Sequence, residues 1–107
     1  MKVKILGTSY SISYKSPTED PLLKECDGYC DESSKKIVVT TQNGNLDDFK
    51  KYQKKCLRHE IIHAFLFESG LAENWEHKNF GQEETVVDWM AIQLPKIIKV
   101  IQEVGAI

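Results

Sequence analysis

The first forty residues carry the alternating pattern of β-strands. Residues 10–14 alternate three large side chains with two serines, as a strand with one buried face does, and residues 2–6 form a similar run. Two more β-rich runs, 28–31 and 36–41, are joined by the polar segment 32–35, which predicts a hairpin.

The pattern changes to helical spacing after residue 45. Apolar side chains recur at intervals of three and four residues between positions 46 and 69, at Phe49, Tyr52, Cys56 and Leu66. His59 and His63 fall on the two positions that complete this seam, so both should face inward. The helix should end at Gly70, with Asn45 or Asp47 as its N-terminal cap.

A second helical region is predicted near the C-terminus. It should begin near Gln82, and Pro95 should kink it or divide it into helices over 83–94 and 96–104. The mixed polarity of residues 71–81 predicts a loop between the two helical regions.

Strands followed by helices are typical of the α+β class. We therefore expect residues 1–107 to form one domain, in which a small, mainly antiparallel sheet packs against a long helix and a C-terminal helical region.

Charge and composition exclude several classes of function. The formal net charge of −2 provides no field that would attract nucleic acid. The apolar stretch of residues 3–6 is too short for a signal peptide or a membrane span, so we expect a cytoplasmic protein without a membrane partner. Cys26, Cys30 and Cys56 are then expected to be reduced structural thiols, although a Cys-x3-Cys pair could also donate two metal ligands.

The chemistry of the chain is concentrated in the run His59-Glu60-Ile61-Ile62-His63. Residues four apart on a helix share one face, so both imidazoles can bind one metal ion, and zinc accepts imidazole readily. Glu60 would then lie beside the metal-activated water and act as a general base. Without a metal, two inward histidines and a glutamate would bring several polar groups to a buried surface at a cost in free energy.

A third ligand is expected from the C-terminal helical region. Glu84 and Asp88 are one helical turn apart, so Glu84 can coordinate the metal while Asp88 hydrogen-bonds the far nitrogen of a liganding histidine. His77 and Glu83 are the alternatives for the third ligand.

These residues resemble the ImmA/IrrE-like zinc metallopeptidases, which are often encoded by phages or mobile elements. In that family a His-Glu-x-x-His helix is followed by Glu-x-x-x-Asn/Asp-x-Phe-Ala, and here the run from Glu84 to Ala91 is similar. The resemblance covers about half of the chain and implies a minimal zincin-like fold with Glu84 as the third zinc ligand. Met90 stands where the family usually has Phe, and Ile62 where many members have Gly.

A second resemblance involves His77. His59-Glu60-Ile61-Ile62-His63 followed by His77 is also similar to the SprT-like zinc proteases, in which a downstream histidine completes the site. The chain lacks their basic DNA-binding surface and four-cysteine zinc ribbon. A metzincin is excluded because the position six residues after His63 is Ser69.

The expected function is hydrolysis of peptide bonds in a protein or peptide substrate, with Zn²⁺ as cofactor. His77, Tyr29 or Tyr10 could also stabilise the reacting carbonyl, although a loop or core role is expected for each. The alternative from another class is a zinc-bound, non-catalytic binding or accessory protein of phage or mobile-element origin, in which four protein ligands close the site.

Overall fold

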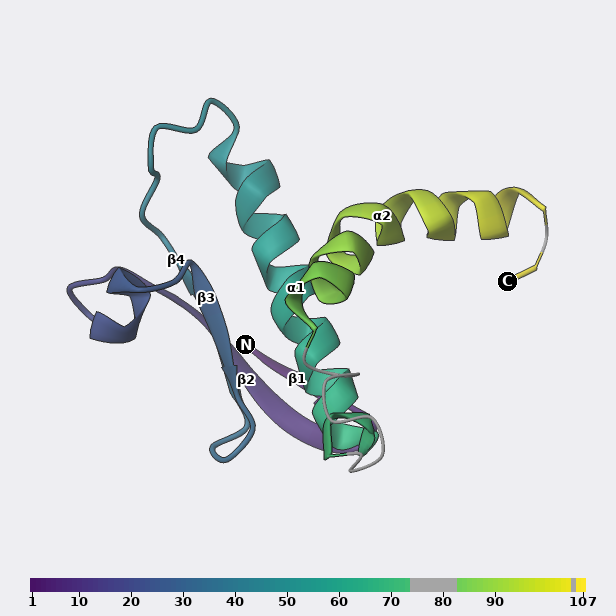
Figure 1. The fold of residues 1–107 in the computed structure, drawn as a ribbon, viewed down its shortest axis with the longest axis horizontal. Coiled ribbons are helices and arrows are strands. Elements are labelled where there is room, and N and C mark those ends of the chain that lie inside the picture. The colour runs from purple at the N-terminus through teal and green to yellow at the C-terminus, as the bar shows by residue number, and fades with distance from the viewer. Residues whose placement is uncertain (74–82, 105) are drawn as a thin grey trace.

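The computed structural model describes residues 1–73, 83–104, 106 and 107 (Figure 1). Within this part of the chain the strands precede the long helices, which confirms the predicted α+β class. The elements are β1 (Lys2–Ile5), β2 (Thr8–Lys15), η1 (Pro21–Lys24), β3 (Gly28–Asp31), β4 (Lys36–Thr40), α1 (Phe49–Glu68), η2 (Leu71–Glu73) and α2 (Glu84–Glu103).

The strands form a mixed sheet with the order β1-β2-β4-β3. Pairs β1–β2 and β3–β4 are antiparallel as predicted, whereas β2 and β4 are parallel, with Ile12 opposite Ile37. β3 and β4 run in opposite directions, and it is β4 that lies next to β2, so this one pair is parallel. This arrangement leaves β3 as an edge strand, and β3 is the strand on which the functional site depends.

The main apolar core lies between the sheet and α1. Its buried members come from alternate positions of the strands and from the seam of α1, and are Ile5, Tyr10, Ile12, Ile37, Val39, Cys56 and Ala64. Burial of one large aliphatic side chain contributes about 1.5–3 kcal/mol, so this cluster fixes the seam of α1 towards the sheet.

The ends of α1 are set by capping residues. Asp48 is the N-cap, and its side chain accepts a hydrogen bond from the backbone N–H of Lys51. The prediction of Asn45 or Asp47 as the cap is therefore wrong, because the helix begins later than expected. Gly70 follows the C-cap Ser69 with a φ of 84°, a left-handed conformation that glycine adopts without strain.

Pro95 was predicted to kink the C-terminal helical region or to divide it, and the division is wrong, because α2 is continuous through Pro95. A proline removes one backbone hydrogen bond, and here the turns on both sides keep the helix intact. The first half packs on α1 through Val87 and Ala91, which contact Ile62 and Leu66. The second half extends away from α1 and the sheet (Figure 1).

Two other predictions concern segments near these helices. The loop expected over residues 71–81 begins with η2, and its remainder, including His77, lies outside the described residues. Among the described helices, none is long and apolar enough to span a membrane.

Candidate metal centre

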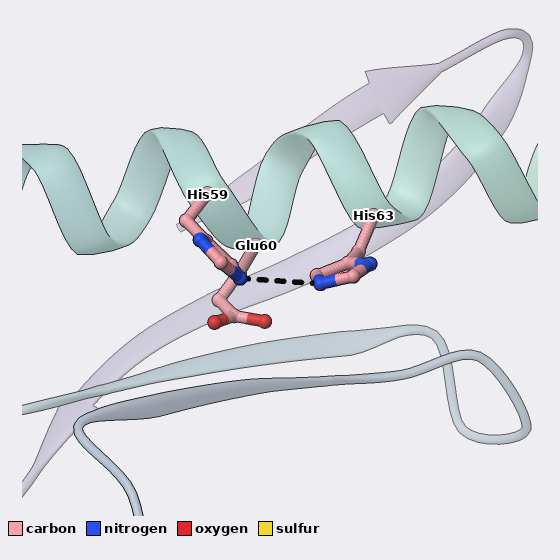
Figure 2. Close-up of side chains that lie close together, drawn as sticks. All are labelled: His59, Glu60 and His63. Atoms are coloured by element: carbon pink, nitrogen blue, oxygen red, sulfur yellow. Dashed lines mark hydrogen bonds between the residues drawn. The ribbon is translucent and has the colours of Figure 1, made fainter. Parts of the chain in front are cut away.

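His59 and His63 are neighbours on the inward face of α1 (Figure 2). Their Nε2 atoms lie 3.2 Å apart, and the side chains are only 14% and 11% exposed. The helical spacing of four residues produces this approach, and the packing of α1 on the sheet keeps water from most of both rings. Burial lowers the pKa of His63, which favours the neutral imidazole that metals bind.

Glu84 completes a group of three converging side chains. It is the first residue of α2, and its Oε2 and Oε1 lie 2.9 Å from Nε2 of His59 and 2.9 Å from Nε2 of His63, respectively. Its side chain is 69% exposed, so the group faces solvent on this side. The preceding residue, Glu83, is the exposed N-cap of α2. It was the alternative third ligand from the C-terminal helix, but its carboxylate contacts neither His59 nor His63.

Asp88 lies one turn after Glu84 and reaches the other nitrogen of His59. Its Oδ1 is 3.3 Å from Nδ1 of His59, so the predicted contact is present. The ammonium group of Lys55 lies 3.1 Å from the same oxygen and holds the pKa of Asp88 below its usual range. A carboxylate in this position fixes the tautomer and orientation of a histidine whose Nε2 binds a metal.

Glu60 is a buried carboxyl group beside the two imidazoles. Its side chain points below α1 towards β3 (Figure 2) and is 8% exposed. Removal from water raises the pKa of Glu60 to about 7, because burial disfavours the charged form. A group with this pKa can accept and release a proton near neutral pH.

The donor set fits a zinc ion. Two nitrogens that are each about 2.0–2.1 Å from a tetrahedral zinc ion lie about 3.3 Å apart, close to the spacing of the two Nε2 atoms. Donor atoms of His59, Glu60 and His63 all lie within 4.8 Å of one another. Two imidazoles and one carboxylate form a set that zinc accepts, with Glu84 as the carboxylate in contact with both rings.

Two cavities open on either side of this group. One, of about 230 Å³, extends to Asp27, Tyr52 and Lys55, and the other, of about 360 Å³, extends to Tyr29 and Phe67. Five residues line both cavities: Cys26, Gly28, His59, Glu60 and Glu84. The two cavities therefore adjoin at the candidate metal centre, and together they are called the groove beside the edge strand β3.

Sequence reasoning missed Gly28, the first residue of β3. A Cβ atom at this position would lie 3.1 Å from the carbonyl oxygen of Val38 and 3.5 Å from Cγ of Glu60. A glycine within a strand marks a close approach of other groups, and this is the signal that could have identified it.

The three cysteines are free thiols. Cys56 is buried in the core, whereas Cys26 lines both cavities and Cys30 lines the larger one. The Sγ atom of Cys26 donates to the carbonyl oxygen of Leu22, 3.5 Å away.

The two tyrosines considered for the reacting carbonyl have other partners. The hydroxyl of Tyr10 donates to Glu68 at 2.7 Å from within the core, and that of Tyr29 donates to Asp20. Tyr29 lines the larger of the two cavities, whereas Tyr10 does not.

Comparisons with known proteins do not identify the chain. It matches no protein-family model, and no curated protein or solved structure is significantly similar to it. The functional interpretation therefore rests on the geometry of the site.

Proposed function

We propose that this chain is a zinc-dependent metallopeptidase in which His59, His63 and Glu84 hold the ion and Glu60 is the general base. The observation that carries the proposal is the position of Glu84, whose two oxygens each lie 2.9 Å from one imidazole nitrogen. These three side chains come from two helices and meet at one point, as the ligands of one ion would.

The position of Glu60 beside the proposed ligands supports a catalytic zinc site rather than a purely structural one. Zinc bound by these residues supplies a Lewis acid that polarises a carbonyl group and lowers the pKa of water to about 7. Glu60 takes a proton from the attacking water and delivers it to the leaving amine nitrogen. Burial raises the pKa of Glu60, so this carboxylate is a stronger base than an exposed glutamate.

The groove beside β3 supports a peptide substrate. An edge strand presents unpaired backbone groups, to which an extended peptide can add as a further strand. A peptide in this position would cross Gly28 and present one of its carbonyl groups to Glu60 and the histidines. The protein or peptide substrate, the relation to ImmA/IrrE-like enzymes and the cytoplasmic location all remain predictions.

The test compares wild type with Glu60→Gln, both shown by elemental analysis to contain zinc. Glutamine keeps the size of the side chain but removes the basic carboxylate, so zinc content and folding should be retained while cleavage falls by at least about 10²-fold. Both proteins are incubated with cellular protein extracts, and new chain termini are identified by mass spectrometry. New termini that require Glu60 support the proposal.

Two outcomes would contradict it. Equal numbers of new termini with both proteins would show that Glu60 is not the base. Retention of zinc with no new termini in either sample would favour the alternative, a zinc-bound binding protein.

A further inference from the structure

A separate cavity on the far side of Lys55 is lined mainly by cationic side chains. It has a volume of about 360 Å³ and lies between the first half of α1 and the middle of α2. Lys51, Lys55 and Arg58 line it from α1, and Lys96 lines it from α2, with Ile92 as an apolar wall. None of the proposed zinc ligands lines this cavity.

The spacing of residues on α1 explains this concentration of charge. Lys51, Lys55 and Arg58 are four and then three residues apart, so they lie on one face of the helix. Packing of α2 on α1 places Lys96 of α2 opposite this face of α1, on the other wall of the cavity. The chain as a whole has a net charge of −2, so the positive charge is a local property of this cavity.

The carboxylates near the cavity do not balance its charge. Asp48 is the one acidic residue in its lining, and Oδ1 of Asp48 already accepts the N–H that begins α1. Lys55 pairs with Asp88 on the side of the metal centre. Among the described residues, no carboxylate forms an ion pair with Lys51, Arg58 or Lys96.

Arg58 is held in one position by a backbone hydrogen bond. It is half-buried, and its Nε donates to the backbone carbonyl of Ala91 at 2.6 Å. This bond uses one of the five N–H groups of the guanidinium and restricts its rotation, while the terminal amino groups can still donate. Partial burial of a cation without an acidic partner costs free energy, and an anion that binds beside the cation offsets this cost.

We propose that this cavity binds a small, multiply charged phosphate anion. Arginine and lysine are the side chains that bind phosphate oxygens most strongly, and apart from Lys55, which pairs with Asp88, three cations of this cavity share one lining carboxylate, Asp48. The cavity volume lies within the range of about 300–1,000 Å³ that is usual for small-molecule sites. The inference is independent of the proposed peptidase function, because it uses none of the zinc ligands.

The test uses inorganic pyrophosphate as the probe and isothermal titration calorimetry at constant ionic strength. The variant Lys51→Gln/Lys96→Gln removes two cations from the cavity. Its matched control, Lys50→Gln/Lys99→Gln, removes the same charge from two exposed lysines outside the cavity lining. We expect the cavity variant to bind pyrophosphate at least about tenfold more weakly than wild type and the control to change by less than about twofold.

The lysine variants also exclude binding at the metal centre. Phosphates bind metal ions, but neither Lys51 nor Lys96 lines the cavities beside the candidate metal centre, so pyrophosphate held there would bind the cavity variant as tightly as wild type. Unchanged binding in the cavity variant, equal weakening in the two lysine variants, or no saturable binding to wild type would each overturn the inference. Circular dichroism confirms that all variants are folded.

Competition experiments identify the source of the phosphate. ATP that binds more tightly than pyrophosphate would assign the site to a nucleotide, and weaker or equal binding would assign it to a free phosphate chain. Tight binding of a single-stranded oligonucleotide that pyrophosphate cannot displace would contradict the assignment to a small molecule.

Discussion

Gly28 lies directly against Glu60, so that a Cβ atom added to the glycine would be 3.5 Å from Cγ of the glutamate and 3.6 Å from its Oε2. The same Cβ would be 3.1 Å from a backbone oxygen, that of Val38, which cannot move without disturbing the sheet. The absence of a side chain at residue 28 therefore leaves the space in which the buried carboxyl group lies.

The first prediction follows from this contact. Gly28→Ala should lower the free energy of unfolding by about 1 kcal/mol or more, as crowding of a packed site does, and should also reduce any peptidase activity. The matched control is Gly44→Ala, because a Cβ at Gly44 meets no atom within 4 Å. Urea unfolding of both variants measures the effect, and equal stability of the two would show that the space beside Glu60 is not required.

The second prediction concerns metal content. Protein purified without chelators should contain about one zinc ion per chain, and His59→Ala or His63→Ala should each lose most of it together with thermal stability. Elemental analysis and thermal unfolding with and without a chelator provide the measurements. If wild type carries no transition metal, the proposed centre is wrong.

The third prediction distinguishes the candidate third ligands. Glu84→Ala should weaken zinc binding strongly, and Asp88→Ala should weaken it by about 10–100-fold, because Asp88 acts through the orientation of His59. His77→Ala serves as the control and should bind zinc nearly as well as wild type. Competition with a zinc-binding dye measures each affinity. The SprT-like arrangement would replace the one proposed here if His77→Ala released the metal and Glu84→Ala did not.

The fourth prediction uses Glu68, which connects the end of α1 to the sheet. Its carboxylate accepts hydrogen bonds from Lys35 at 2.6 Å, Tyr10 at 2.7 Å and Thr8 at 3.1 Å. The ion pair with Lys35, followed by the bond from Tyr10, lowers the pKa of Glu68. A lowered pKa stabilises the folded state at pH values above the unfolded pKa, which is about 4.3 for glutamate, and this stabilisation is lost as the pH falls.

Glu68→Gln should therefore have a lower melting temperature than wild type at pH 7, and the difference should shrink as the pH falls below about 4.3. Glu103→Gln is the control, because Glu103 is exposed at the end of α2. A difference between wild type and Glu68→Gln that stays constant over this pH range would mean that the charge of Glu68 does not contribute.

Local patterns in the sequence were sufficient to predict the strands, the two long helical regions and the closeness of His59 to His63. These features depend on periods of two and of three to four residues, which can be read from neighbouring positions. The spacing of Glu84 and Asp88 also predicted that both would face one element, and the structure places them beside His59.

Features that depend on packing between distant segments could not be predicted in this way. The parallel pairing of β2 with β4 depends on which strand of a hairpin joins the sheet, and neither strand's pattern specifies it. The contact between Gly28 and Glu60 and the bond from Lys55 to Asp88 join residues that are far apart in the chain. Pro95 was expected to kink or divide a helix, but the turns on each side of it form a single helix.

The small apolar contact between α1 and α2 has a consequence for metal affinity. Two proposed ligands belong to α1 and one to α2, whereas the helices are joined by the cluster of Ile62, Val87, Ala91 and Leu66. An ion can be held by all three ligands only while this contact is made, so the binding constant includes the free energy of association of the two helices. Side chains that never touch the ion, such as Ala91, thus help to determine how tightly it is held, and the ion in turn acts as a tie between the two helices.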